Sequence, residues 1–395
     1  ALSGWRPQVF GSSSVSQITT RVPGVGTTNQ TGTTVGISVS QFLFRGFQTV
    51  NSTKQAEASV QADRAALSNT EQDTLFAAAQ AYMNVLTDQA IVELNRQNIE
   101  VLAEQLRATR DRFQVGEVTN TDVAQSEAAL SGAYTELNAA EANLLSSKAV
   151  YRQVVGHDPV NLAPAAPAAN IPSTLDAALR EGHANHPAIA SSIYSEEAAA
   201  YAVKTAEGGL LPTVTLQGSA DYSNGGGAFI NETSSASITA QLNIPIYQGG
   251  LEYSQVREAK ENRSKALLQV DSIRQQVRAA VVSAWGVLQA ATASITSGQA
   301  QVNAAQIALD GVREEAKVGQ RTTLDVLDSE QILLDAKVAL VNAESDRVVA
   351  SYALLSAIGA LTAQKLALAV DHYQPTVHYE QVRDKWFGLR TPSGQ

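Results

Sequence analysis

The chain has 395 residues, enough to bury a large core, and 44% of them are apolar, which is ordinary for a folded protein. Its formal net charge of −10 argues against a binder of nucleic acid or anionic lipid. The lack of cysteine excludes thiolate catalysis, cysteine-ligated zinc and disulfide bonds. No run approaches the roughly 18 to 20 apolar residues of a spanning helix, so a chain that crossed a membrane would have to use β-strands.

The first expected elements are two strands, 5–20 and 33–44, on either side of a stretch rich in Gly, Thr and Asn. In the second strand apolar residues alternate with small or polar ones, the period-2 pattern of a strand with two different faces. The pattern returns at 210–222 and 234–247, around the loop 223–227. The chain is therefore expected to contain four strands, arranged as two hairpins.

The turn Val115-Gly116 recurs as Val318-Gly319, and the two halves of the chain align at a constant offset of 203 residues. The same offset pairs Asp122 with Asp325. One register across more than a hundred residues indicates an internal duplication. We expect two structural repeats, residues 1–186 and 187–395.

Each repeat is predicted to contain a long helix and a shorter return helix joined by the Val-Gly turn, because a glycine with positive φ ends the first helix and a threonine caps the second. The return helix after the second turn carries two apolar heptad seams, so we expect it to contact helices on both sides. The expected segments are 49–114, 119–155 and a mid-section 157–186 in the first repeat, and 187–207, 251–317, 323–358 and a tail 360–395 in the second.

The lengths of these helices do not match. A long helix spans about 100 Å and its return helix only about 55 Å. Residues 187–207 supply the length that is missing after the first return helix, and no equivalent run follows the second return helix. We therefore expect a helix of roughly 25 residues upstream of Trp5.

Four strands of about 11 to 14 residues are long enough to cross an outer membrane at a tilt, but four strands cannot close a barrel. Open sheet edges are not tolerated in lipid, so several chains must share one barrel. Three chains give twelve strands. The expected fold is an α+β membrane channel, a homotrimer whose 12-stranded β-barrel continues into a tunnel of α-helices.

Three stretches resemble the TolC family of trimeric outer-membrane efflux and secretion channels, namely 244–250, 112–116 and 318–328. The resemblance covers nearly the whole chain. It implies the exit duct of a tripartite efflux pump or a type I secretion system, in the outer membrane of a Gram-negative bacterium with a large periplasmic portion. It also implies as partners a periplasmic adaptor (membrane fusion protein), an inner-membrane pump of RND, ABC or MFS type, and outer-membrane lipid, with no nucleic acid and no cofactor.

Asp325 and Asp328 lie three residues apart after the second turn and therefore share a helix face. If that face points to a threefold axis, six carboxylates converge, attract cations and raise one another's pKa. The spacing alone favours ordinary acids at a helix N-terminus, stabilised by the helix dipole. The resemblance reverses this preference, because acidic rings at the matching positions line the constriction of the family.

Arg321, taken alone, is a solvated turn arginine. The resemblance implies that it latches a closed periplasmic mouth, whose opening resembles an iris, through polar links to the neighbouring hairpin at Asp122, Thr121 and Gln105. The chain departs from the family at Ala316, where an aromatic latch residue is expected. The alternatives are a weaker latch and a latch that uses Gln320 and Lys317 instead.

The turn residues Val115, Gly116, Val318 and Gly319 are expected to form exposed tips, and the resemblance implies that adaptors dock there. Aromatic residues near strand ends are expected to form an interfacial belt, with ordinary strand packing as the alternative. These residues are Phe42, Phe44, Phe47, Tyr222 and Tyr247.

The sequence contains no signature of an enzyme: a Ser-His-Asp motif, a P-loop and a dinucleotide fingerprint are all missing. His183 and His186 lack the neighbouring acids or cysteines of a metal site. The alternative to a channel is a soluble periplasmic coiled-coil adaptor or scaffold, which would also have long helical hairpins. Such a protein would not need two strand pairs with glycine-rich loops.

Overall fold

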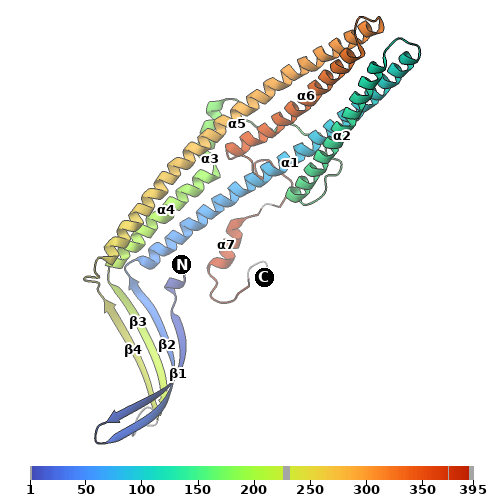
Figure 1. Ribbon diagram of the computed structural model, residues 1–395. Helices are drawn as coiled ribbons and strands as arrows, with labels where there is room; N and C mark the ends of the chain where they lie inside the picture. Colours follow the sequence, from blue (N-terminus) through green and yellow to red (C-terminus); the bar gives the residue numbers. More distant parts are fainter. Residues whose placement is uncertain (1, 226–231, 372, 391–395) are drawn as a thin grey trace. The chain divides into compact units, whose positions relative to one another are not determined.

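The computed structural model describes residues 2–225, 232–371 and 373–390. The glycines at 226 and 227 of the expected second loop and the last five residues of the expected tail lie outside these ranges. In chain order the elements are η1 (Leu2–Trp5), β1 (Gln8–Val22), β2 (Gly26–Arg45), α1 (Gln48–Gln114), α2 (Asn120–Val155), α3 (Leu175–Asn185), α4 (Pro187–Glu207), η2 (Gly208–Leu210), β3 (Thr213–Asn224), β4 (Glu232–Asn243), α5 (Leu251–Lys317), α6 (Thr323–Ala357) and α7 (Pro375–Arg383) (Figure 1).

The chain divides into two compact units. Unit 1 consists of Ala1–Ala65, Ala190–Ser272 and Tyr373–Gln395 and contains the β-sheet. Unit 2 consists of Ala66–Ile189 and Ile273–His372 and contains the two turns between long and return helices. Both units therefore draw on both sequence repeats.

The four strands form one antiparallel sheet in sequence order, with β1 and β4 at its edges (Figure 1). The register places Val39 of β2 opposite Val9 of β1 and opposite Gly218 of β3. Because successive residues point to opposite faces, the pairing gathers most apolar side chains on one face and most polar ones on the other. The apolar exceptions on the polar face are Phe10, Ile18, Val22 and Phe42, and the polar exceptions on the apolar face include Gln17, Arg21 and Gln41. The apolar face carries Val9, Val35, Ile37, Val39, Leu216, Ile238 and Leu242, and the polar face Ser12, Ser14, Ser38, Ser40, Ser219, Asp221 and Ser237.

The first hairpin is longer than the sequence pattern predicts. The stretch 26–32, which was expected to be a loop, belongs to β2 and pairs with β1 as far as Val22 opposite Gly26. Its threonines are β-branched and suit a strand, and the pairing with β1 outweighs the glycines. At the other end β1 begins at Gln8 and not at residue 5, because Leu2–Trp5 form a 3₁₀-helix.

The two long helices have the same length, 67 residues each. In unit 2 the core gathers where α3, α5 and α6 meet, around Ala178, Val281 and Leu354. The chain beyond α6 is fastened to α1, since Gln72 accepts a hydrogen bond from the Leu361 amide at 3.3 Å. This contact joins the first long helix to the end of the second hairpin.

One helix corrects the expectation about apolar runs. A window of 18 residues within α5 has a mean hydropathy of 1.3, long and apolar enough by length and composition to cross a membrane. The cause is that α5 has no Asp, Glu, Lys or Arg between Arg278 and Asp310, although small polar residues interrupt the apolar ones. Only 11% of the window is buried within the single chain.

Candidate functional site at the helical tips

The two Val-Gly turns have the same geometry. Gly116 and Gly319 have φ of 78° and 76°, the left-handed conformation that favours glycine. In each turn the next amide reaches back to a helical carbonyl: Glu117 donates to Arg112, and Gln320 donates to Glu315, both at 2.9 Å. The preceding valines, Val115 and Val318, are exposed. The turns therefore form two matching tips in unit 2.

Each return helix begins with a capping box. The amide and the hydroxyl of Thr322 donate to Asp325 Oδ2 at 2.8 and 2.9 Å, and Thr119 makes the same two bonds to Asp122 at 2.8 and 2.7 Å. The Thr322 amide and then its hydroxyl lower the pKa of Asp325. Within the single chain Asp325 therefore performs the ordinary helix-capping role, with one carboxylate oxygen.

Asp328 differs from Asp325 in its surroundings. It is exposed and lines a groove of about 380 Å³ between α6 and the first hairpin. Gln125, the residue that matches Asp328 at the offset of 203, lines the same groove. The two return helices thus meet along equivalent faces, and only one of the two matched positions carries a charge.

The expected latch residues Arg321 and Asp122 bond mainly within their own hairpins. Arg321 Nε donates to Glu315 Oε2 at 2.8 Å, within its own hairpin. Asp122 bonds to Thr119 of its own capping box, and the Thr119 hydroxyl and then its amide lower the pKa of Asp122, with a smaller contribution in the same direction from the Thr323 side chain of the other hairpin. Thr121 is exposed. A link from Arg321 to the neighbouring hairpin stays a prediction.

Gln105 lines a second groove between α1 and α5, of about 870 Å³. Ala316 and Lys317 line it from the opposite helix. The groove has a charged wall on both sides, formed by Glu100, Glu104 and Arg112 from α1 and by Asp310, Arg313 and Glu314 from α5.

The tips carry ion pairs of reversed polarity, which the sequence reading missed. In the first hairpin Arg112 on the helix pairs with Glu117 in the turn at 3.1 Å. In the second, Glu315 occupies the position of Arg112 and pairs with Arg321. The sequence contains a signal for this difference, because the offset of 203 aligns Arg112 of the first hairpin with Glu315 of the second, two residues of opposite charge.

A second ion pair holds each hairpin together below the tip. Arg110 Nη2 lies 2.6 Å from Glu127 Oε1, and Arg313 pairs with Glu330 at the matching positions. The two pairs differ in burial: the Glu127 side chain is 50% exposed and that of Glu330 is 9% exposed. Each hairpin is thus braced internally by an ion pair, and the pair in the second hairpin is the more buried of the two.

The expected belt residues lie at both ends of the sheet in unit 1. Phe42, Phe44 and Phe47 lie where β2 leads into α1, and the rings of Phe44 and Phe47 pack edge to face at 5.2 Å. Tyr222 lies near the opposite end, paired with Val35. Tyr247, which follows β4, is 82% exposed. An interfacial role for them stays a prediction.

Among the described residues no group of three or more His, Cys, Asp or Glu could hold a metal ion. Of the two histidines considered, His186 is partly buried, and burial lowers its pKa.

Comparisons with known proteins all point to outer-membrane channels. A family model described as outer membrane efflux protein matches residues 1–157 and 178–360. Outer membrane efflux protein BepC of Brucella suis is 47% identical over 396 residues, which cover 100% of this chain and 86% of that protein. Outer membrane protein TolC of Escherichia coli is 29% identical over 317 residues, which cover 75% and 64%. The structure of the CmeC outer membrane channel of Campylobacter jejuni matches with a TM-score of 0.79 at 18% identity, over 96% of this chain and 82% of that chain.

Proposed function

We propose that this chain, which belongs to the outer membrane efflux protein family and is an exit duct of the Gram-negative outer membrane, acts as one of three identical subunits. In this proposal twelve strands close one barrel, which continues into a periplasmic tunnel of α-helices. Substrates pass through it without chemical change, delivered by an adaptor and an inner-membrane pump.

The observation that carries the proposal is the state of the sheet edges. Among the described residues β1 pairs only with β2 and β4 only with β3, and every residue of both edge strands is exposed, so the outer edge of each strand is left without a partner. In hydrocarbon an unpaired edge leaves backbone amides and carbonyls unsatisfied at a cost of several kcal/mol each. Pairing β4 of one copy with β1 of the next removes both edges, and three copies give an even number of strands.

The two faces of the sheet support the same arrangement. A barrel wall needs apolar side chains toward lipid and polar ones toward the lumen, and the register separates the two kinds. The α5 window supports it as well, because an apolar stretch of 18 residues with few or no charges, of which only 11% is buried within one chain, requires cover from a neighbour. The soluble adaptor or scaffold considered as an alternative needs neither feature.

Disulfide trapping tests the shared barrel, and the chain offers a background without cysteine. Within one chain β1 and β4 are separated by two strands, so their Cα atoms lie about 14 Å apart. A disulfide requires Cα atoms within about 7 Å. A bond between Ser12→Cys and either Ser235→Cys or Ser237→Cys therefore has to join two copies, and we expect covalent trimers on a denaturing gel.

The matched control is Ser219→Cys/Ser237→Cys. These two positions are directly paired, with their hydroxyl oxygens 3.1 Å apart, so the bond forms inside one chain and leaves a monomer band. If the control oxidises while β1 and β4 cysteines yield only monomers across the scanned positions, the shared barrel is wrong.

The gate is proposed at the tips. Two observations support it: the Thr323 side chain of the other hairpin is among the groups that lower the pKa of Asp122, and Gln105 lines the same groove as Lys317. In the assembled duct the Arg321 guanidinium would keep only part of its bonding to Glu315 and would also donate hydrogen bonds to Asp122, Thr121 or Gln105 of the adjacent hairpin. Because each hairpin is braced internally, opening would separate hairpins and leave each one intact.

The constriction is proposed at Asp325 and Asp328. Asp325 uses Oδ2 for the capping box, which leaves its second oxygen and the exposed carboxylate of Asp328. Three copies would place six carboxylates near the axis, where they favour cations.

The surface proposed for the adaptor consists of the exposed tips, Val115-Gly116 and Val318-Gly319, and the charged groove between α1 and α5.

A further inference from the structure

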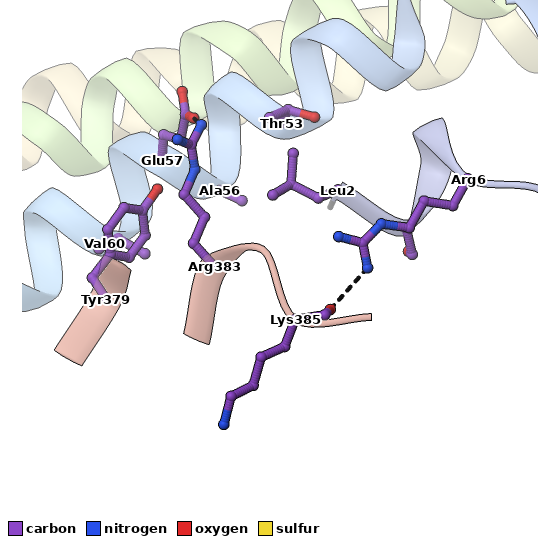
Figure 2. Close-up of a pocket in the computed structure, with 10 residues that line it drawn as sticks. Leu2, Arg6, Thr53, Ala56, Glu57, Val60, Tyr379, Arg383 and Lys385 are labelled. Carbon is purple, nitrogen blue, oxygen red and sulfur yellow. Dashed lines mark hydrogen bonds and ion pairs between the residues drawn. The ribbon is translucent and has the colours of Figure 1, made fainter. Parts of the chain in front are cut away.

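The C-terminal segment of the described chain was expected to be a polar tail, but it folds back onto unit 1. Its helix α7 lies beside α1, where Arg383 Nη2 donates to Glu57 Oε1 at 3.0 Å (Figure 2). The guanidinium of Arg64 lies 4.8 Å from the centroid of the Tyr379 ring. These contacts join residues more than 300 positions apart in the sequence and fix the direction in which the chain leaves α7.

Arg6 connects this segment to the start of the sheet. Its Nη1 donates to the Lys385 carbonyl at 2.8 Å, as Figure 2 shows, and its guanidinium lies 4.3 Å from the centroid of the Trp386 ring. Arg6 precedes Gln8, the first residue of β1, by two positions. The β2 side chain of Gln41 also donates to the Trp5 carbonyl at 3.4 Å. Trp386 is therefore held at the end of the sheet where the strands lead into the helices.

The segment that follows α7 contains three large apolar residues that are exposed. The exposed fraction is 61% for Trp386, 90% for Phe387 and 101% for Leu389. Lys385 and Arg390 flank them, and Lys385 Nζ donates to the Arg390 carbonyl at 2.8 Å. Aromatic and aliphatic side chains between cations have the composition of a segment that lies in a membrane interface.

The charge of this segment is opposite to that of the protein. Arg383, Lys385 and Arg390 against Asp384 give residues 383–390 a net charge of +2, whereas the whole chain carries −10. The overall acidity argued against binding to anionic lipid, but it does not describe this end of the sheet. Cations close to a bilayer surface are attracted to anionic headgroups.

We propose that residues 385–390 are an interfacial anchor, which inserts Trp386, Phe387 and Leu389 into the phospholipid leaflet at the helix-proximal end of the sheet. The anchor would fix the depth of the barrel in the bilayer and would extend the aromatic set of Phe42, Phe44 and Phe47 at the same end. It goes beyond the duct function and requires only that the sheet enter a bilayer. Packing against a neighbouring copy is the competing outcome.

Tryptophan fluorescence distinguishes these outcomes, because the chain has three tryptophans, Trp5, Trp285 and Trp386. The variant Trp5→Phe/Trp285→Phe leaves Trp386 as the sole probe. The protein is reconstituted in vesicles of phosphatidylglycerol and phosphatidylcholine, with lipids brominated either near the glycerol backbone or near the end of the acyl chain. We expect shallow bromines to remove about half or more of the Trp386 emission and deep bromines to remove much less.

The matched control is Trp5→Phe/Trp386→Phe, which leaves Trp285. This residue packs against the core cluster around Val281 in unit 2, so bromolipids should leave its emission unchanged. A charge variant, Lys385→Gln/Arg390→Gln in the Trp386-only chain, should reduce quenching in anionic vesicles and leave it unchanged in neutral ones. Should Trp5→Phe disturb the fold, the difference between the parent and Trp386→Phe gives the same reading.

Ion conductance of the same vesicles separates this proposal from the duct. If the vesicles conduct ions but neither brominated lipid quenches Trp386, the anchor is refuted and the duct is still supported. This holds whether the Trp386 ring is surrounded by a neighbouring copy or by water. Quenching by shallow bromines in vesicles that do not conduct supports the anchor and counts against the duct.

Discussion

The same ion pair occurs once in each hairpin, so a substitution in one hairpin can be compared with the matching substitution in the other. Replacing Arg313 by Met removes the partner of Glu330, whose side chain is only 9% exposed, and retains most of the arginine stem volume. Replacing Arg110 by Met removes the partner of Glu127, whose side chain is 50% exposed. The sequence position within the hairpin is the same, so the comparison isolates burial.

The expected magnitudes follow from solvent access. Removing one partner of a fully buried pair costs about 3 to 5 kcal/mol, because the other charge stays buried without compensation. Arg313 is itself 40% exposed, which brings water to the site, so we expect about 2 kcal/mol. Exposed pairs contribute about 0 to 1 kcal/mol, and Arg110→Met should fall in that range.

Native-state hydrogen exchange followed by mass spectrometry measures the local opening of each return helix. We expect Arg313→Met to accelerate exchange in the first turns of α6 by about 30-fold, and Arg110→Met to accelerate exchange in α2 by less than about fivefold. The variant Glu330→Gln, which keeps a neutral acceptor, should lie between the two. Equal effects of the two arginine substitutions would refute the reasoning from burial.

Three further predictions concern the tips. Gly319→Ala should destabilise the second turn by about 1 to 2 kcal/mol because φ is positive, whereas Gly311→Ala within α5 should be neutral or stabilising, as measured by thermal loss of helical circular dichroism. The capping contribution of Asp325, whose pKa is lowered, should be complete above the ordinary carboxylate pKa of about 3.9 and lost as the pH falls through the lowered value. In exchange experiments Asp325→Asn should abolish this acid-side change in α6, and a change that persists would assign it to another group. Arg321→Ala should raise the conductance of reconstituted protein, and an unchanged conductance would exclude it from the latch.

The sequence predicts the hairpins well because their determinants are local and occur twice. A positive φ at Gly116 and Gly319, a threonine cap and an acid three residues later all act within a single turn of helix, so the offset of 203 transfers them from one hairpin to the other. The same reasoning explains why the sequence supports two interpretations of Asp325. Its position three residues after Thr322 predicts a capping box, which is a local contact. A role at a threefold axis depends on other copies of the chain, which local sequence does not describe.

Contacts between distant segments could not be predicted in this way. The stretch 26–32 has the composition of a loop, and only its pairing with β1 makes it a strand. The docking of α7 depends on Arg383 meeting Glu57, and nothing local indicates which acid an arginine will find. The partner of Arg321 is an intermediate case, because Glu315 is close in sequence but lies across the turn.

The measurement that tests the account most directly is single-channel conductance in planar bilayers, with a trivalent cation such as La³⁺ added on the side of the helical tips. The parent is compared with Asp325→Ala/Asp328→Ala. Asp122→Ala is the matched control, because it removes the equivalent capping acid from the first hairpin and leaves the proposed ring intact.

The account predicts a small, cation-preferring conductance in the parent, which the trivalent cation blocks. Asp122→Ala also removes a proposed latch partner, so it should conduct more than the parent but should still be blocked. The double variant should resist block. Block of the double variant at the parent concentration would place the constriction elsewhere in the tunnel. A protein that never inserts or conducts would contradict the duct itself.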